Sequence, residues 1–180
     1  MKAALSFAVL ALLAACRREP IEVRREPKEE APAMADMGAK PAGLRWSLPA
    51  GWKELPATGM RAAAFEPPQA DGKSEVTVVA LPGDVGGELA NVNRWRGQIG
   101  LTPLDEAGLA SSRERVAARA GVVAVYDFTS LGDNKSRTVA GMISVRGVTW
   151  FFKLSGQEKA VRAAKPAFLK LLRGLKTDEA

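Results

Sequence analysis

Carboxylates are the side chains in this sequence that could supply a general base. The 180-residue chain contains no histidine and a single cysteine, Cys16. Histidine triads, cysteine/histidine dyads, zinc sites built on imidazole or thiolate, haem ligation and iron–sulfur clusters therefore lack their bases or ligands. A hydrolase or transferase would have to use Asp84, Glu88 or Asp127, because two carboxylates within reach of each other can divide the acid and base roles. No spacing requires such a pair, so we predict no catalytic residue, metal site or cofactor and keep a carboxylate enzyme as an alternative.

A glycine-rich turn precedes a predicted helix in the middle of the chain. Residues 81–88 read Leu-Pro-Gly-Asp-Val-Gly-Gly-Glu, and residues 88–99 carry apolar side chains at helical spacing. Free amide groups at the start of a helix can hold an anion. The spacing matches neither Gly-Lys-Ser/Thr nor Gly-x-Gly-x-x-Gly, and glycine before a helix often only lets the chain turn.

The same helix is dense in asparagine, arginine and tryptophan. Asparagine is a mediocre helix former, while exposed tryptophan and arginine are enriched in binding hot spots. We therefore take one set of residues as a candidate partner-binding or anion-binding surface: Gly83, Asp84, Gly86, Gly87, Asn91, Asn93, Arg94, Trp95 and Arg96. The alternative is ordinary amphipathic packing with Trp95 in the core.

A second helix is predicted near the C-terminus, with a basic side opposite an apolar side. The capping-box pair Ser155 and Glu158 indicates its start, and Pro166 is expected to kink or divide it. The apolar stripe is Val161, Ala164, Phe168, Leu171, Leu172 and Leu175, and the candidate basic stripe is Lys159, Arg162, Lys170 and Arg173. Such a basic stripe is either a solvated face or a docking face for an anionic membrane or partner.

Alternating apolar residues predict the strands that position these helices. They cover residues 44–48, 60–65, 75–81, 113–119, 122–130, 136–146 and 148–154, while residues 100–110 read as irregular. The turn at residues 72–73 predicts a hairpin, residues 113–119 an edge strand, and the last three strands a meander. Asp127 and Lys153 are charges within strands that should point to solvent or pair with each other. The predicted class is α+β, an antiparallel sheet of about six strands with helices packed on it.

The first sixteen residues predict where the protein is delivered. Lys2 precedes an apolar run over residues 3–15 that is too short to cross a bilayer and is typical of a secretion signal. Its end, Leu13-Ala14-Ala15-Cys16, resembles the lipobox of bacterial lipoproteins. That resemblance implies cleavage before Cys16, a diacylglycerol on its sulfur and usually an acyl chain on the new amino group, which together hold a protein at a membrane. Arg17 departs from the aspartate that marks inner-membrane retention in these families, so the resemblance implies the outer membrane, facing the periplasm.

Residues 17–42 predict a flexible tether. They are charged, contain four prolines and no aromatic residue, and cannot bury enough apolar surface to order themselves. Their ends should lie on the order of 30 Å apart. Their acidic and basic side chains cancel, so nearly all of the net charge of +6 belongs to residues 43–180. A basic exported domain suits lipid head groups, lipopolysaccharide phosphates or acidic protein faces, and no nucleic-acid partner is predicted.

The order of the elements and the opening Trp46-Ser47-Leu48-Pro49-Ala50-Gly51-Trp52 resemble the PsbP-like fold over residues 44–176. Residues 86–98 and 150–154 are similar to an uncharacterised group of exported bacterial proteins. The PsbP resemblance implies an antiparallel sheet with helices on its faces and an accessory or binding role, and it carries no catalytic residue.

The predicted organisation is a signal peptide over residues 1–15, a lipidated cysteine and tether over residues 16–42, and one domain over residues 43–180. The predicted function is a membrane-anchored, non-catalytic binding or assembly module that presents residues 83–98 to a protein or an anionic envelope component. The alternatives are the carboxylate enzyme and a protein that holds an apolar ligand between the sheet and the helices.

Overall fold

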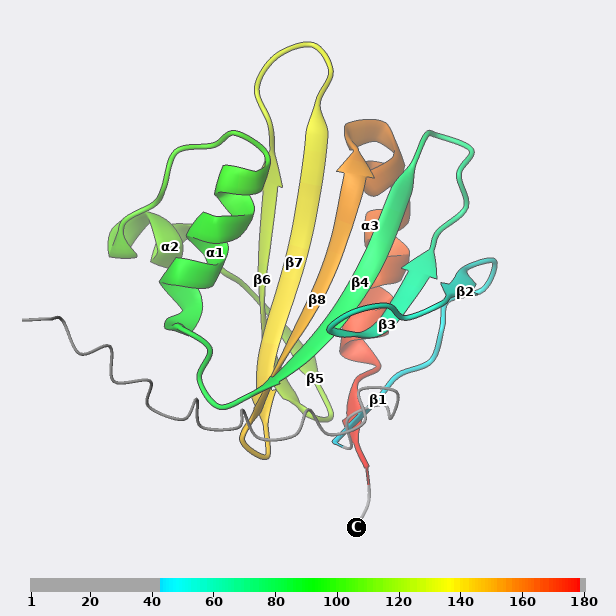
Figure 1. Cartoon of the computed structure of the whole chain (residues 1–180), viewed down its shortest axis with the longest axis vertical. Helices are drawn as coiled ribbons and strands as arrows, with labels where there is room; N and C mark the ends of the chain where they lie inside the picture. The colour runs from blue at the N-terminus through cyan, green and yellow to red at the C-terminus, as the bar shows by residue number, and fades with distance from the viewer. Residues whose placement is uncertain (1–42, 179–180) are drawn as a thin grey trace, which may run out of the picture. The chain divides into compact units, whose positions relative to one another are not determined.

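A seven-stranded antiparallel sheet forms the centre of the domain (Figure 1). The computed structural model describes residues 43–178, so the predicted signal peptide, Cys16 and the tether lie outside the described residues. The strand order is β2-β3-β4-β8-β7-β6-β5. The strands are β2 (Lys53–Leu55), β3 (Arg61–Glu66), β4 (Ser74–Pro82), β5 (Glu114–Ala118), β6 (Gly121–Thr129), β7 (Ser136–Val145) and β8 (Val148–Gln157). The predicted α+β class and the edge position of β5 are confirmed.

Helices cover both faces of this sheet. The helices α1 (Gly87–Gln98) and α2 (Glu106–Ser112) lie on one face, and α3 (Glu158–Arg173) lies on the other (Figure 1). A separate ladder joins β1 (Leu44–Arg45) to β9 (Lys176–Thr177), so the described chain begins and ends side by side. Within residues 43–178, no helix combines the length and the apolar character that crossing a bilayer requires.

The central strands bury side chains on both faces. In β6, Val123 and Val125 point toward α3, whereas Tyr126 and Phe128 point toward α1, because successive side chains of a strand alternate. This alternation agrees with the sequence prediction. It produces two cores, one of which joins the sheet to α3 and the other to α1 and α2.

A two-residue turn joins β7 to β8. Its residues, Arg146 and Gly147, have φ values of 51° and 75°. A hairpin turn of this length favours positive φ at both positions because its twist then matches the twist of the strands. Glycine adopts the left-handed conformation freely, whereas for a residue with a side chain, such as Arg146, this conformation costs about 1 kcal/mol of steric strain.

The predicted C-terminal helix is present as α3, but it begins at Glu158, the last residue of the predicted capping box, so the prediction that Ser155 caps it is wrong. Ser155 and Gly156 still pair with β4 on one side and β7 on the other, and this pairing extends β8 through Gln157. Gln157 is the N-cap residue, and its side chain makes no capping hydrogen bond. The helix is also continuous through Pro166 rather than divided there. Apolar residues before and after the proline pack on the same core, which keeps the two halves of the helix together.

Three short elements are absent from the sequence prediction. Residues 100–110 contain the start of α2, whose N-cap Asp105 accepts a hydrogen bond from Gly108 N at 2.8 Å. The strands β2 and β9 are defined by pairing with β3 and β1. Segments of two or three residues carry no periodic pattern that could reveal them.

Candidate functional site

The two asparagines of α1 hold backbone groups of the domain. Asn91 is 2% exposed, and its Nδ2 donates to Val85 O and Gly87 O, each at 2.7 Å. Asn93 Nδ2 donates to Leu104 O at 2.9 Å, and its Oδ1 accepts from Leu104 N at 2.7 Å. Each amide satisfies backbone groups in neighbouring turns, which explains why asparagine occurs in this helix without invoking a partner.

Trp95 is a core residue, as the packing alternative predicted for it, so it is not an exposed member of the candidate surface. It is 4% exposed and meets Phe151 edge to face, with ring centroids 5.7 Å apart. Arg96 also bonds within the domain, because its Nε donates to Thr102 O at 2.9 Å and its guanidinium carbon lies 5.8 Å from the centre of the Phe128 ring. Both side chains therefore hold α1 in place, Trp95 against β8 and Arg96 against Thr102 and β6.

The glycines before α1 shape the backbone. Gly83, Gly86 and Gly87 have φ values of 74°, 77° and 76°, a region that glycine adopts without steric strain. Asp84 is exposed in this turn, and Glu88 lies in the first turn of the helix. The carboxylate of Asp84 is therefore exposed near the helix start, whereas that of Glu88 is paired with Arg113.

Glu88 links α1 to the sheet through Arg113 and Tyr126. Arg113 Nη2 lies 2.5 Å from Glu88 Oε2, Arg113 Nε donates to Tyr126 Oη at 3.0 Å, and the Tyr126 hydroxyl donates to Glu88 Oε1. Burial, and next the hydrogen bond to Glu88, raises the pKa of Tyr126 to about 12. Glu88 thus already accepts hydrogen bonds from two neighbours and is not free to act as a base.

Asp127 lies on the opposite face of β6, toward α3. Its Oδ2 accepts from Arg137 Nη2 at 2.6 Å and from Lys165 Nζ at 2.8 Å. Burial alone would raise the pKa of Asp127, but the hydrogen bonds from Arg137 and Lys165 outweigh it and hold the pKa below its ordinary value. Glu88 and Asp127 lie on opposite faces of the sheet, so these two carboxylates do not form a pair with each other.

Three basic side chains converge on the sheet face that carries α1. Lys153 of β8 is half-buried, its Nζ donates to Gln98 Oε1 at 3.1 Å, and within residues 43–178 it forms no salt bridge. Burial, and next the positive charges of Arg61 and Arg94, lower the pKa of Lys153. We call Arg61, Arg94 and Lys153 the basic row.

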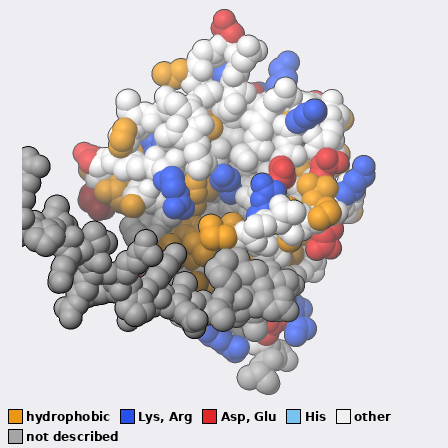
Figure 2. Space-filling view, in the orientation of Figure 1, with side chains coloured by type: hydrophobic (Ala, Val, Ile, Leu, Met, Phe, Trp, Pro, Cys, Tyr) orange, Lys and Arg blue, Asp and Glu red, His pale blue; other side chains and the backbone are white. Residues whose placement is uncertain are grey.

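The two arginines of the basic row come from β3 and α1. Arg94 is exposed on α1, where its Nη2 donates to Asn91 Oδ1 at 2.7 Å. Arg61 pairs with Glu75 at 2.7 Å, so its charge is neutralised in part. Figure 2 shows basic side chains spread across the middle of this face. The arrangement leaves more positive than negative charge around Lys153.

The sequence predicts part of this row. Arg94 belongs to the predicted surface, and Lys153 is recognised as a charge within a strand. Of the two alternatives given for Lys153 and Asp127, exposure to solvent or pairing with each other, the pairing is wrong. The two side chains lie on opposite faces of the sheet, since Lys153 meets Gln98 of α1 and Asp127 meets Lys165 of α3. Arg61 has no signal in the sequence, because only the pairing of β3, β4 and β8 places it near Lys153.

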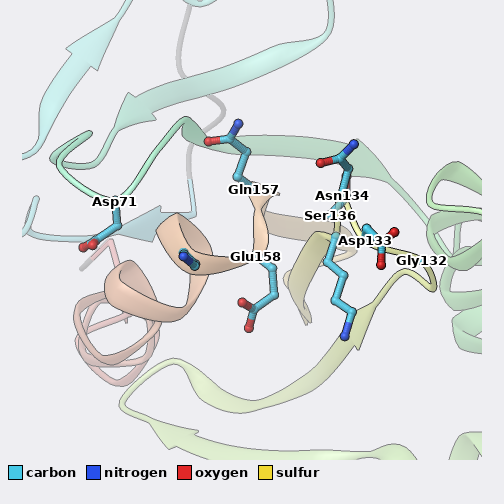
Figure 3. A pocket seen from close by; sticks show the side chains of 9 residues that line it. Asp71, Gly132, Asp133, Asn134, Ser136, Gln157 and Glu158 are labelled. Atoms are coloured by element: carbon cyan, nitrogen blue, oxygen red, sulfur yellow. The ribbon is translucent and has the colours of Figure 1, made fainter.

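Two cavities, of about 770 and 820 Å³, lie at the end of the sheet where β4 and β7 begin. Figure 3 shows the first, with Asp71 on one side, Asn134 and Asp133 on the other, and Gln157 and Glu158 between them. Lys135 and Lys159 also line it, so acidic and basic groups are mixed. Leu55 is the one large apolar residue lining the second. The mostly polar residues that line these two cavities do not suit an apolar ligand.

The basic stripe of α3 is exposed along its whole length. Lys159, Arg162, Lys170 and Arg173 all face solvent, and Arg162 lies 2.5 Å from Glu158. Lys159 stands at the end of the helix that borders the first cavity, and Arg173 stands at the other end. Within residues 43–178, no cluster of three or more carboxylates is placed to hold a metal ion.

No family model matches the chain, and no curated protein matches it. Its structure is similar to the solution structure of cyanobacterial PsbP (CyanoP) from Synechocystis sp. PCC 6803, with a TM-score of 0.48 and 16% identity over 76% of this chain and 94% of that chain. It is also similar to LpqN, involved in cell envelope biogenesis of Mycobacterium tuberculosis, with a TM-score of 0.46 and 13% identity over 76% of this chain and 83% of that chain.

A protein of Bacteroides thetaiotaomicron has a TM-score of 0.46 and 11% identity over 76% of this chain. The matched region spans 45% of that longer protein, which is less than half of its length. At these TM-scores and identities, the similarities transfer neither an activity nor a partner to this chain.

Proposed function

We propose that this protein is a lipid-anchored, non-catalytic binding module of the bacterial envelope, and that its basic row binds an acidic face of a partner protein. The anchor is Cys16 at the end of the lipobox-like Leu13-Ala14-Ala15-Cys16. The outer membrane is the proposed location, because Arg17 rather than aspartate follows the cysteine.

One observation carries the proposal, namely the environment of Lys153. The Lys153 ammonium group is half-buried, donates to one amide oxygen and lies near two further cations, and the one carboxylate that favours its charge, Glu75, is already paired with Arg61. A carboxylate from outside the domain would lower the energy of Lys153, Arg94 and Arg61 together, because charge complementarity across an interface relieves repulsion within one partner.

The shape of the surface favours a protein over a small molecule. The basic row spans residues of β3, β8 and α1, and none of its three members lines either of the two cavities. An open face of this kind suits a broad partner surface, whereas small ligands are usually bound in enclosed pockets.

The carboxylate enzyme is the weaker proposal on the same geometry. Glu88 is bonded to Arg113 and Tyr126, while Asp127 is bonded to Arg137 and Lys165 on the other face of the sheet. Asp84 is exposed in the turn before α1, so the carboxylate enzyme would have to use Asp84 as its base, beside a Glu88 that Arg113 and Tyr126 already hold.

Cross-linking in native cells tests the proposed function. The full-length lipoprotein and its Arg94→Glu/Lys153→Glu variant are recovered after mild cross-linking, and the proteins attached to each are identified. The matched control is Arg115→Glu/Lys135→Glu, which changes the net charge equally at two exposed positions away from the basic row. We expect one acidic partner with the unaltered chain and the control, and its loss from the basic-row variant. The same recovery with all three chains, or no protein with any of them, would overturn the proposal.

A further inference from the structure

One end of the domain brings together four parts of the chain. Gly43 N, where the described chain begins, donates to Asp178 Oδ2 at 2.9 Å. The β5–β6 turn joins the segment after α3 through Ala120 N and Leu175 O at 3.1 Å. The β7–β8 turn joins it through Arg146 Nη2, which donates to Asp178 O at 3.1 Å. Figure 1 shows these turns and β1 together at the lower end of the sheet.

Each of these four parts presents an exposed basic side chain. The five residues, which we call the basic end, are Arg45, Arg119, Arg146, Arg173 and Lys176. One carboxylate, Asp178, is bonded within the group, where it pairs with Arg45 and accepts from Gly43 N. The hydrogen bond from Gly43 N, and next the one from Arg45, hold the pKa of Asp178 below its ordinary value. Asp178 therefore stays negative near neutral pH. A second carboxylate, Asp84, is exposed next to Gly83, whose N donates to Gly147 O of the β7–β8 turn at 2.7 Å, so five basic residues stand against two carboxylates.

The opposite end of the domain has no such excess. There Lys73, Lys135 and Lys159 are interleaved with carboxylates around the two cavities, namely Asp71, Asp133, Glu158, Glu66 and Glu75. The two ends of one sheet thus differ in charge, although both consist of turns and helix ends. A difference of this kind orients a protein near a charged surface.

Arg146 adds a conformational argument. It occupies a left-handed turn position, with φ of 51°, that asparagine or glycine would fill with less strain. Its side chain makes one hydrogen bond, to a backbone oxygen near the end of the described chain, and is otherwise exposed. The local conformation therefore does not explain why a cation stands at the tip of this turn.

We propose that the basic end docks on the anionic phospholipid head groups of the membrane to which the chain is anchored. The inference rests on the proposed lipid anchor. Residues 17–42 lead from Cys16 to Gly43, and a flexible chain of this length spans on the order of 30 Å. Gly43 lies at the basic end, so this is the end of the domain at which the segment from the proposed anchor joins it. Lipid chains and a basic patch together bind a membrane more stably than either alone.

Vesicle flotation tests this inference without the anchor or a protein partner. The chain from residue 16 onward with Cys16→Ser is mixed with phosphatidylglycerol or phosphatidylcholine vesicles at low salt. We expect flotation with the anionic vesicles only, and release as the salt concentration rises. Each basic residue near an anionic surface strengthens binding about five-fold, so Arg146→Glu/Arg173→Glu/Lys176→Glu should weaken it at least about 100-fold.

The matched control reverses three charges at the other end, in Lys73→Glu/Lys135→Glu/Lys159→Glu. We expect its affinity to stay within about three-fold of the unaltered chain, because those residues lie beyond a Debye length of about 8–10 Å from the docked surface. If circular dichroism shows the first variant to be unfolded, Arg119→Gln/Arg173→Gln replaces it, with an expected loss of about 25-fold. Equal losses at both ends, or no flotation with anionic vesicles, would overturn the inference. Because the chain lacks Cys16 and no partner protein is present, none of these results depends on lipidation or on a partner, and the basic row is the same in every chain compared.

Discussion

The folded domain disfavours the positive charge of Lys153. A role of this charge in binding can therefore be tested separately from a role in stability. Because burial and two arginines lower its pKa, the unfolded chain binds this proton more tightly than the folded domain does. The resulting penalty is present at neutral pH and is relieved as the pH rises through the lowered pKa toward the ordinary value of about 10.4.

Replacing Lys153 with methionine should therefore keep or improve stability while it abolishes partner recovery. We expect Lys153→Met to raise the free energy of unfolding by up to about 1 kcal/mol at pH 7, because the stem still packs and the buried charge is gone. Urea unfolding at pH 7 and pH 10 measures this gain, which should shrink at the higher pH. A variant less stable than the unaltered domain at pH 7 would show that Lys153 is a structural residue.

Asp127 differs from Lys153 because its neighbours, Arg137 and Lys165, stabilise its charged form. Asp127→Asn leaves Arg137 and Lys165 without their shared carboxylate and should lower the free energy of unfolding by about 1–3 kcal/mol at pH 7. The depressed pKa means that this contribution is present above about pH 3.9 and is lost as the pH falls through the folded-state pKa.

The control for Asp127 is Asp133→Asn, in the exposed β6–β7 turn, which should change stability by less than about 0.5 kcal/mol. Urea unfolding from pH 7 down to pH 3 should show the difference between the unaltered chain and Asp127→Asn narrowing at the acid end. A constant difference across this range would mean that the carboxylate charge does not matter.

Individual side chains mark the limit of prediction from the sequence. Alternation along a strand correctly separates Val123 from Tyr126, yet it does not reveal what faces each side chain. Lys153 and Asp127 are both visible as charges in strands, and only the fold assigns one to α1 and the other to α3. The asparagines of α1 suggest a partner surface because their backbone partners, Val85 O and Leu104 O, lie in turns whose positions the sequence does not specify.

The packing of α3 on the sheet depends on a residue without a side chain. A Cβ atom added at Gly141 of β7 would lie 3.0 Å from Leu172 Cδ1 and 3.1 Å from Val123 Cγ1. Gly141→Ala should therefore push the helix and the sheet apart and lower the free energy of unfolding by about 1–3 kcal/mol. Chemical denaturation measures this loss, and an unchanged midpoint would show that the interface adjusts at no cost.

The same substitution in α1 should have the opposite sign. Gly97 is exposed in a helix, and no heavy atom lies within 4 Å of an added Cβ. Gly97→Ala should raise the free energy of unfolding by about 0.5–1 kcal/mol, because alanine is the better helix former. Destabilisation by both alanines would indicate that glycine itself, rather than the space around Gly141, explains the first result.

Among the elements, length decides what the sequence reveals. The strands from β3 to β8 are recognised because each is long enough for alternation to show. The strand predicted over residues 44–48 is present only as the two-residue β1, and β2 and β9 are defined only by their pairing partners. The capping-box prediction fails because Ser155 and Gly156 are already held by two neighbouring strands. Pairing on both sides prevails over a local pattern whose contribution is about 1 kcal/mol.

For the whole protein, the first prediction concerns the anchor. Cys16→Ser should move the protein from the membrane fraction to the soluble fraction in cells, because the variant lacks the sulfur that would carry the lipid. Fractionation followed by immunoblotting measures the change, and mass spectrometry of the unaltered chain should find a diacylglycerol on its N-terminal peptide. An unmodified Cys16 in the membrane fraction would contradict the proposed anchor.

The general architecture of the molecule could be predicted, but its functional surface only in part. Hydrophobic patterning is sufficient to predict an α+β domain, because the side chains of both cores can be assigned from it. The basic row combines Arg61, Lys153 and Arg94 from elements distant in the sequence, so it requires the order β3-β4-β8 and the position of α1 above it. The same holds for the basic end, which four separate segments assemble.

Site-specific photo-cross-linking at position 98 tests the basic row most directly. Gln98 contacts Lys153 and is itself exposed, so a benzophenone side chain placed there in native cells should capture whatever covers the row. We predict one cross-linked protein from position 98, none from a control at position 135, and loss of the adduct when Arg61→Glu/Lys153→Glu is added. An adduct that persists in that variant, or the absence of any adduct at position 98, would contradict the proposed function.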